Sequence, residues 1–355
     1  MSLKAQILSR IRTDGPISLA SYMGDCLMHP TLGYYATRDP FGQAGDFTTA
    51  PEISQMFGEL IGLSLAQAWL DQGCPAPFTL AELGPGRGTL MADLLRATRA
   101  VPGFHAAARI ALIEQSPTLR GIQAQTLAAH EPTWHDSAQS LAEQPLFLIA
   151  NEFFDALPIR QFARTGPHWR ERRVGAQGDR LVLGMTDPAP VPALEHRLAD
   201  TSDGDIVEFC PMVPAVTNAI AGRIARHGGA ALILDYGDWR SLGDTLQALR
   251  AHQSADILGM PGAADLSAHV DFEAIASAAR SAGCAHSRLS TQGVFLERLG
   301  ITARAQRLAD GATGKEPENI IAAHRRLTHP AEMGNLFKTL GLYPETAAPP
   351  PGLEA

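Results

Sequence analysis

A run of three alternating glycines near residue 85 limits the fold more than any other feature of this chain. Residues 78–83 form an apolar run that suits a buried strand, and Gly84, Gly86 and Gly88 follow it. Residues 90–97 then have helical character. Glycines allow positive φ and let a ligand approach the main chain, and a helix that begins after them offers free N–H groups to a negatively charged group. The stretch therefore predicts a strand, a turn and a helix, with a ligand at the turn.

Three interpretations of this turn compete. A nicotinamide site would have Gly-x-Gly-x-x-Gly and an acidic residue about 20 residues later. Here Thr89 replaces the third glycine, and the next acidic strand end, Glu114, lies 28 residues after Gly86. A connection without a ligand is the plainest alternative. The spacing Glu82-x-Gly-x-Gly-x-Gly instead resembles motif I of class I S-adenosylmethionine (SAM) methyltransferases. That resemblance implies that the loop, including Gly84, Gly86 and Gly88, holds the methionine part of SAM and that Glu114 binds both ribose hydroxyls.

Composition excludes several classes of protein. The chain has 355 residues, 45% of them apolar, which is ample for a core, and a net charge of −8, which argues against a general nucleic-acid binder. The four cysteines stand far apart and the histidines show no metal-ligand spacing, so neither a metal site nor a disulfide framework is expected. No apolar run reaches about 18 residues, so no membrane span is expected. Residues 1–12 lack the apolar core of a secretory signal, and we expect a cytoplasmic protein.

Strands and helices alternate after residue 78. Strands are predicted at 78–83, 109–114, 132–135, 146–150 and 231–235, with helices at 90–99 and 117–130 between the first three. This order predicts a parallel sheet covered by helices on both faces, with a ligand at the carboxyl ends of the strands. Polar residues occur at four of these ends, and we expect them to line the cofactor site, although Asp136 by itself suits a solvated loop. They are Glu82, Glu114, Asp136 and Asn151.

The remaining segments surround this sheet. Helices are predicted in 1–28, with a break at Gly15-Pro16, and in 52–69. Residues 168–185 alternate as a hairpin, 205–210 as a strand, and 213–227 and 271–282 as helices. A closing antiparallel hairpin is expected at 288–296, followed by helices at 299–310, 316–327 and 332–340 and a disordered proline-rich tail at 346–355. The expected domains are an N-terminal helical segment with a lid loop (1–77) and a methyltransferase domain (78–345) that carries an insertion at about 160–228.

Four separated stretches resemble one family, the MidA-like class I methyltransferases. They are residues 45–55, 82–89, 151–158 and 261–272. The family includes the mitochondrial arginine methyltransferase needed for assembly of respiratory complex I. The resemblance implies an α/β, Rossmann-like, seven-stranded SAM methyltransferase sheet, with an N-terminal helical segment and a β-rich and helical insertion after strand four. It also implies the cofactor SAM and a bacterial cytoplasmic member with mitochondrial eukaryotic relatives. The implied activity is arginine methylation of a protein, namely the homologue of the 49-kDa complex I subunit.

Site residues follow from this resemblance and from the positions of charged groups. The loop 45–51, with Asp46 and Thr49, is expected to lie over the cofactor. A guanidinium stays protonated near pH 7 and is a poor nucleophile. Carboxylates that pair with two of its nitrogens can draw charge there and orient the third. Glu152 and Asp155 follow strand four directly and are the expected pair, although Asp155 also suits a turn cap.

Weaker candidates lie further along the chain. His269 could relay a proton, whereas Asp265 and Asp271 are less specific, since Asp271 equally suits a helix N-cap. Two functions of other classes stay open: a non-catalytic assembly factor that docks a client protein, and a nicotinamide enzyme. The intact glycines and acidic strand ends favour catalysis over the first. The expected partner is a protein substrate, and the sequence does not fix the oligomeric state.

Overall fold

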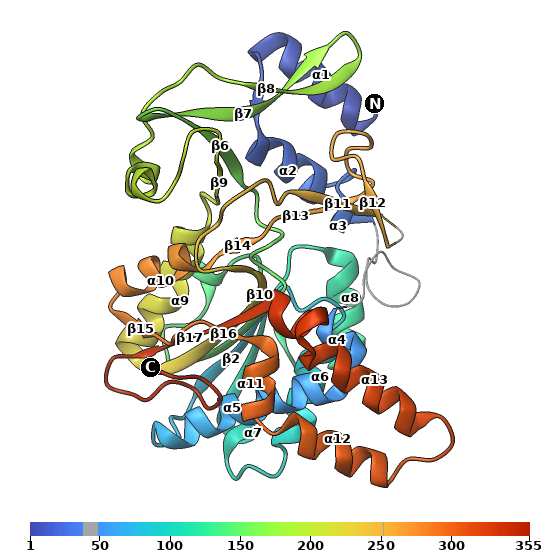
Figure 1. Ribbon diagram of the computed structural model, residues 1–355. Coiled ribbons are helices and arrows are strands. Elements are labelled where there is room, and N and C mark those ends of the chain that lie inside the picture. Colours follow the sequence, from blue (N-terminus) through green and yellow to red (C-terminus); the bar gives the residue numbers. More distant parts are fainter. Residues whose placement is uncertain (38–48, 251) are drawn as a thin grey trace.

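In the part of the chain that the structure describes, a mixed sheet of nine strands forms the centre of the molecule (Figure 1). The computed structural model describes residues 1–37, 49–250 and 252–355. The hydrogen-bonded path runs β15-β17-β10-β5-β2-β3-β4, with β14 beside β10 and β16 beside β17. Its strands are β2 (Phe78–Leu83), β3 (Ala108–Ile113), β4 (Thr133–His135), β5 (Leu146–Asn151), β10 (Gly229–Asp238), β14 (Val270–Asp271), β15 (Cys284–His286), β16 (Ser290–Thr291) and β17 (Phe337–Pro344). Strands β2 to β5 and β10 are parallel, and β17 is antiparallel to β10.

Helices cover both faces of this sheet, which explains why its strands are continuous apolar runs. In β10, Leu232 and Leu234 belong to one buried core, whereas Ala231 and Ile233 belong to the core on the opposite face. The first core contains α5 (Gln55–Asp71), α6 (Thr89–Thr98), α11 (Gln292–Arg298), α12 (Ile301–Asp310) and the end of α13 (Glu316–Thr328). The second contains α9 (Val213–His227) and α10 (Phe272–Ser281).

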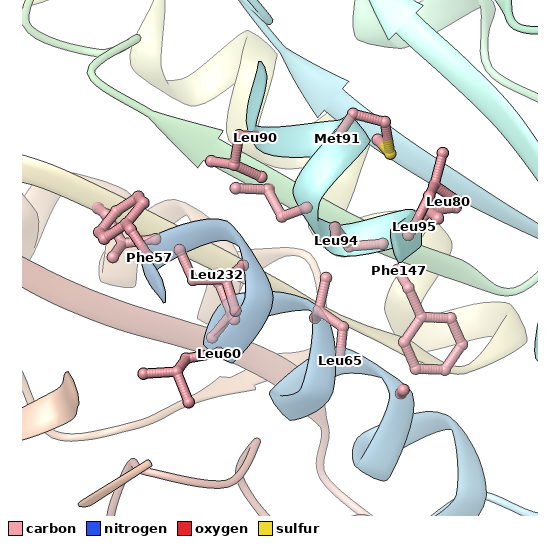
Figure 2. Close-up of a cluster of buried hydrophobic side chains, with 14 of the residues drawn as sticks. Phe57, Leu60, Leu65, Leu80, Leu90, Met91, Leu94, Leu95, Phe147 and Leu232 are labelled. Carbon is pink, nitrogen blue, oxygen red and sulfur yellow. The ribbon is translucent and has the colours of Figure 1, made fainter. Parts of the chain in front are cut away.

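Helix α6, which carries the glycine turn at its start, packs directly on α5 (Figure 2). Gly58 and Gly62 make this close approach possible, because a Cβ at either position would lie 2.8 Å from a side chain of α6. Leu90, Met91, Leu94 and Leu95 of α6 are all buried in the first core. This packing fixes the helix whose N-terminus faces the ligand site.

A second lobe contains the N-terminal helices and a separate antiparallel sheet (Figure 1). Helices α1 (Leu3–Asp14) and α2 (Leu19–Met28) share a buried core with Val174 and Leu181 of that sheet. The sheet comprises β1 (Ile17–Ser18), β6 (Arg160–Thr165), β7 (His168–Gln177), β8 (Arg180–Met185) and β9 (Ile206–Phe209). A third, three-stranded sheet lies between the two lobes and comprises β11 (Gln247–Arg250), β12 (Gln253–Ala255) and β13 (Asp265–Ser267).

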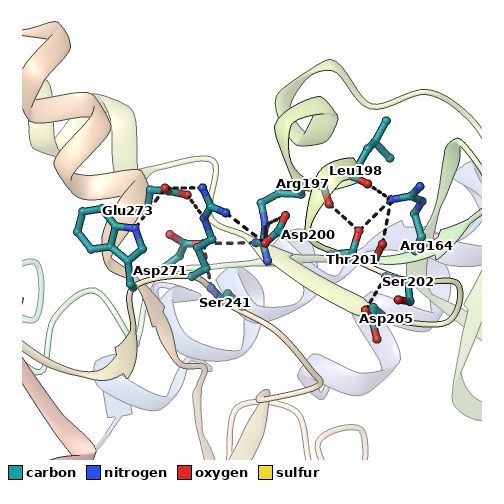
Figure 3. Close-up of polar contacts among 12 residues, drawn as sticks. Arg164, Arg197, Leu198, Asp200, Thr201, Ser202, Asp205, Ser241, Asp271 and Glu273 are labelled. Carbon is teal, nitrogen blue, oxygen red and sulfur yellow. Dashed lines mark hydrogen bonds and ion pairs between the residues drawn. The ribbon is translucent and has the colours of Figure 1, made fainter.

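Ion pairs and hydrogen bonds join the second lobe to α10 (Figure 3). Buried Arg197 lies in the short helical segment η2 (Pro192–Ala199) and pairs with Asp200 at 3.1 Å. Arg197 also pairs with Asp271 at 3.8 Å. Arg240 pairs with Asp200 at 3.4 Å and with Glu273 of α10 at 2.7 Å. Asp271 caps α10, because its Oδ1 accepts the N–H of Ala274 at 3.0 Å. Asp271 is therefore an N-cap, which was the alternative interpretation of its sequence position.

The remaining helices are the ten-residue α8 and several helices of three to five residues. They are α3 (Tyr34–Thr37), α4 (Ala50–Ile53), α7 (Phe104–Ala107), α8 (Pro117–Thr126), η1 (Ala138–Ser140) and η3 (Pro330–Gly334). Within the described ranges, none of the helices has the length and apolar character needed to cross a membrane.

The structure departs from the sequence predictions at the C-terminal edge of the sheet. The expected hairpin at 288–296 is wrong, because α11 occupies its second half, and the expected helix at 332–340 is wrong, because β17 begins at Phe337. Leu340 and Leu342 of β17 are buried in the second core, and β17 pairs with β10, so tertiary burial and strand pairing override local helical character. The central sheet also has nine hydrogen-bonded strands where seven were predicted, since β14 and β16 are two-residue strands beside a path of seven.

The C-terminal segment was predicted to be disordered, and this is also wrong. Leu353 is buried in the first core, and the Pro351 carbonyl accepts a hydrogen bond from the Ser64 hydroxyl of α5 at 2.8 Å. The Glu354 carbonyl accepts the Arg288 N–H at 2.8 Å. Its proline-rich composition suggested a solvated tail, but the Leu353 side chain and these backbone hydrogen bonds fix it to the helices and strands around the central sheet.

Candidate functional site

A cavity of about 370 Å³ lies at the carboxyl ends of β2, β5 and β10. This is the edge at which parallel α/β sheets bind ligands. The glycine turn, the turn after β5, and β11 and β13 of the third sheet all contribute lining residues. The lining residues with polar side chains are Tyr35, Thr49, Glu52, Glu82, Arg87, Thr89, Asn151, Glu152, Asp155, Tyr236, Gln247, Asp265, Ser267 and His269.

The glycine turn adopts the backbone that its sequence predicts. Gly84 and Gly86 have φ of +57° and +53°, in the left-handed region that favours glycine. A Cβ at Gly84 would lie 3.1 Å from the Phe153 ring, so the turn also touches the segment after β5. Gly88 does not line the cavity and is instead the N-cap residue of α6. The Thr89 hydroxyl donates to Glu52 Oε1 at 2.6 Å and joins α6 to α4.

Glu82 is an acidic side chain held in an apolar environment at the end of β2. It is buried, and this burial raises the pKa of its carboxyl to about 8, although a backbone N–H of Met91 acts in the opposite direction. Within the part of the chain that the structure describes, its Oε2 has no hydrogen-bond donor. A buried carboxylate oxygen without a donor is costly and is suited to receive a cationic group.

Burial of Glu82 predicts a pH dependence of stability. A pKa raised from 4.5 to about 8 means that the folded protein binds this proton more tightly than the unfolded chain. The stabilising contribution is therefore complete below pH 4.5 and is lost as the pH rises through about 8. We expect Glu82→Gln, which stays neutral, to be more stable than the wild type at pH 9 by roughly 1–3 kcal/mol without ligand. Thermal unfolding at pH 6 and pH 9 measures this.

The matched control for that measurement is Glu318→Gln, since Glu318 is exposed in the first turn of α13 and its substitution should leave the pH profile unchanged. Parallel pH profiles for the wild type and Glu82→Gln would contradict the assignment of a proton to Glu82.

The turn after β5 brings further carboxylates to the cavity. Glu152 has a positive φ of 50°, and its Oε1 accepts from the Ala50 N–H and the Asn151 side-chain amide, both at 3.2 Å. Burial, followed by the charge of Asp155, raises the pKa of Glu152 to about 8. Burial also raises the pKa of Asp155 to about 6, although a hydrogen bond with the Tyr236 hydroxyl acts to lower it.

Buried acceptor atoms without donors gather at this site. Besides Glu82 Oε2, the Asn151 Oδ1 and Asp155 Oδ1 atoms have no hydrogen-bond donor among the described residues. All three residues line the cavity. Asp265 differs from these residues, because its Oδ1 accepts a hydrogen bond from the Tyr35 hydroxyl at 3.0 Å. Three buried acceptor atoms without donors in one cavity predict ligands that carry ammonium or guanidinium groups.

Of the other predicted site residues, some line this cavity and some lie outside its lining. Thr49 and His269 line it, and burial lowers the pKa of His269. Glu114 follows β3 outside the lining; its Oε1 accepts the Ser116 N–H at 2.8 Å. Its Oε2 is linked to the glycine turn through Gln123, whose side chain donates to the Gly86 carbonyl at 2.8 Å.

Asp136 and Asp46 are the two remaining predicted cofactor ligands. The Asp136 side chain is 85% exposed and pairs with Arg120 at 2.6 Å, as a solvated loop acid would. Asp46, together with residues 45–48 of the expected lid loop, lies outside the described residues. The cofactor role of both residues stays a prediction.

Sequence reasoning missed several residues of the site. Tyr236 lines the cavity and Asp235 lies directly beneath the turn after β5. Their position at the end of a predicted strand was a usable signal, because the other strand ends had been selected on that ground. Gln247 had no such signal, since the third sheet brings it to the cavity from a segment without a motif, whereas Ser267 lies in the stretch 261–272 that carried the family resemblance and was not selected.

Comparison with known proteins finds relatives over almost the whole chain. A family model for S-adenosyl-L-methionine-dependent methyltransferases (Methyltransf_28) matches residues 60–290. The mitochondrial protein arginine methyltransferase NDUFAF7 homologue of Drosophila melanogaster is 36% identical, covering 98% of this chain and 86% of that protein. Human mitochondrial NDUFAF7 is 34% identical, covering 95% and 82%.

Solved structures agree with this result. A COG1565 superfamily member from Burkholderia thailandensis, crystallised with S-adenosyl-homocysteine, is 29% identical and superposes with a TM-score of 0.84, covering 96% of this chain and 91% of that one. A native structure of a COG1565 superfamily protein from the same organism has a TM-score of 0.80 at 29% identity. The chain thus has the α/β fold of a SAM methyltransferase, with a mixed sheet.

Proposed function

The chain belongs to the MidA-like family of SAM-dependent methyltransferases, and from this premise we propose that it methylates an arginine side chain of a protein substrate. The observation that carries the proposal is the set of buried acceptor atoms without donors beside the glycine turn, since both SAM and arginine are cationic. Relatives named protein arginine methyltransferases, aligned over 95% or more of this chain, support the choice of arginine.

The residues present fit SAM. When bound, SAM supplies a methyl group on a positively charged sulfonium. The glycine turn offers main chain without side chains, and Glu82 Oε2 offers an unpaired acceptor to the methionine ammonium. Thr49 and Asn151 line the same cavity as the turn. Glu114 is proposed to hold the ribose hydroxyls, with Asp46, Gly88 and Asp136 as further cofactor residues by resemblance.

Glu152 and Asp155 are proposed to hold the guanidinium. Two carboxylates that pair with two of its nitrogens concentrate positive charge there and leave the third nitrogen free to attack the methyl carbon. Holding that nitrogen in line with the sulfur–carbon bond can contribute ~7–11 kcal/mol toward the barrier. The new carbon–nitrogen bond forms as the carbon–sulfur bond breaks, and one proton must then leave the methylated nitrogen.

His269 is proposed to accept that proton. It lines the cavity, and burial, together with the positive charge of Lys338, lowers its pKa, which favours the neutral imidazole at pH 7. The centroid of its ring lies 5.3 Å from the centroid of the Tyr236 ring, and the Tyr236 hydroxyl hydrogen-bonds with Asp155. A neutral imidazole can accept a proton, whereas a buried arginine or lysine could not do so readily.

Replacement of Glu114 tests the ribose assignment. We expect Glu114→Ala to weaken SAM and S-adenosyl-homocysteine alike by roughly 1.5–3 kcal/mol, the range for hydrogen bonds to a charged group. Part of the loss will come from Gln123, which donates to both Glu114 and the Gly86 carbonyl. Calorimetric titration measures the affinities, and Glu114→Gln, which retains an acceptor oxygen, should lose less. Wild-type affinity in the alanine variant would refute the assignment.

The client protein is the finer part of the proposal. By family resemblance it is the homologue of the 49-kDa subunit of respiratory complex I, with methylation supporting assembly of the complex. Deletion of the gene, followed by mass spectrometry of methylarginine across the proteome, tests this directly. Loss of a mark on that subunit supports the proposal. Loss of marks only on lysine or on small molecules would exclude arginine as the acceptor, and an unchanged proteome would favour a non-catalytic assembly factor.

We further propose that residues 78–345 form the methyltransferase domain, together with α5 and the C-terminal segment that pack in its first core, and that the second sheet is an insertion after β5, the fourth strand of the central sheet in chain order. Strands β6 to β9 hydrogen-bond with one another and with β1 rather than with the central sheet, which supports this division. Helix α9, which was included in the expected insertion at 160–228, packs in the second core of the central sheet. We also propose a bacterial cytoplasmic location for this chain, whereas its eukaryotic relatives are named mitochondrial.

A further inference from the structure

Asp235 is a buried acid whose hydrogen-bond partners are backbone amides. It lies in β10 and has no exposed surface. Its Oδ2 accepts the N–H groups of Phe153, Phe154 and Asp155 at 3.2, 2.9 and 3.2 Å. Its Oδ1 accepts the N–H of Tyr236 at 2.9 Å. One carboxylate therefore fixes three successive peptide groups of the turn that carries Glu152 and Asp155.

The backbone of that turn is arranged to receive an anion. Glu152 has φ of 50°, which an ordinary side chain rarely adopts, and the three N–H groups that follow it converge on one oxygen. Successive N–H groups in such a conformation form an anion-binding concavity. Here the carboxyl group of Asp235 takes that place, because β10 pairs with β5 with Leu234 opposite Asn151. The Glu152 N–H also donates to the Leu234 carbonyl at 2.9 Å.

We propose that Asp235 is a positioning residue for methyl transfer, which holds the 152–155 turn so that the Glu152 and Asp155 carboxylates face the cavity at fixed separation. The inference rests on the proposed role of those two carboxylates. Asp235 cannot touch a substrate, because it has no exposed surface and lies beneath the turn. Its effect arises from geometry, since misplacing a reacting group by about 1 Å can cost ~10²-fold in rate.

Asp235→Asn tests the proposal with little change in volume. An amide places an NH₂ donor against either the Tyr236 N–H or the three N–H groups of the turn, so one set of hydrogen bonds is lost. We expect amide hydrogen exchange to accelerate at residues 153–155 while β2 and β3 stay protected. We also expect SAM affinity within a few-fold of the wild type and kcat lower by ~10²-fold. Asp238→Asn is the matched control, because Asp238 is an exposed acid in the same strand.

A double-mutant comparison separates positioning from general destabilisation. If Asp235 acts through Glu152, then Asp235→Asn in a Glu152→Gln background should lower kcat much less than in the wild-type background. Full additivity of the two losses would overturn the proposal, as would unchanged exchange at 153–155 or a normal kcat despite faster exchange. If Asp235→Asn does not fold, Asp235→Ser is assayed in the same way.

Failure of the proposed function would be distinguishable. It would appear in the wild type, as an absence of methylarginine when the protein and labelled SAM are added to a lysate of the deletion strain. The exchange measurement does not depend on that activity, so turn residues that exchange no faster in Asp235→Asn would overturn the positioning role by themselves.

Discussion

Glu152→Gln is expected to slow methylation of an arginine substrate by ~10²–10³-fold while SAM binds within a few-fold of the wild type. Glutamine keeps the shape of the side chain and its hydrogen bonds to Ala50 and Asn151 but removes the charge. That charge interacts more strongly with the guanidinium as positive charge shifts toward the paired nitrogens, so its loss should fall on kcat. Single-turnover assays with labelled SAM, combined with calorimetry, separate the two effects.

The pH profile provides an independent check of this result. Burial and Asp155 raise the pKa of Glu152 to about 8, so the carboxyl is largely protonated at pH 7 before a cation binds. Because the ionised form is the active one, kcat/KM for the arginine substrate at saturating SAM should rise as the pH passes from about 7 to 9. The Glu152→Gln profile should lack this rise.

Two outcomes would contradict the assignment of Glu152. A normal rate in Glu152→Gln would show that this carboxylate does not hold the guanidinium, and attention would move to Asp155 and Asp265, which line the same cavity. Loss of SAM affinity in the same variant would make Glu152 a cofactor ligand. Asp155→Asn should act in the same direction as Glu152→Gln, because Asp155 Oδ1 is a buried acceptor without a donor among the described residues.

Gly84→Val and Gly86→Val are expected to weaken SAM by at least ~10²-fold, or about 3 kcal/mol, with the fold retained. Both glycines have φ above +50°, and a β-branched residue there is strained by roughly 1–3 kcal/mol. At Gly84 the new side chain would also press on the Phe153 ring, since even a Cβ would lie 3.1 Å from it. Calorimetric titration with SAM and S-adenosyl-homocysteine measures the loss.

Gly178→Val separates backbone strain from loss of the ligand site. Gly178 has a similar φ of +61° in the β7–β8 turn, and a Cβ there would meet no atom within 4 Å. Its variant should lose a comparable amount of stability, measured by thermal unfolding, and bind SAM normally. Unchanged SAM affinity in both Gly84→Val and Gly86→Val would remove the glycine turn from the cofactor site.

The sequence by itself determined the elements whose signals are local. Buried parallel strands are continuous apolar runs, so β2 and β5 were predicted within one residue, and α9 was predicted with its observed bounds. The glycine turn was also predictable, because positive φ at Gly84 and Gly86 is a property of the residue type as much as of the fold. The acids at the strand ends followed from the alternation of strands and helices.

Tertiary structure alone decided the C-terminal edge and the partners within the site. β17 contains residues that locally suit a helix, and only pairing with β10 makes them a strand. The third sheet brings Gln247 and Ser267 to the cavity that the glycine turn and the turn after β5 also line, and no local pattern encodes such a contact. Asp235 shows the same limit: its sequence position marks a strand end, but its role depends on three N–H groups 80 to 82 residues away in the chain. Hydrogen-bond partners so far apart are fixed by the register between β5 and β10, which is a property of the folded sheet.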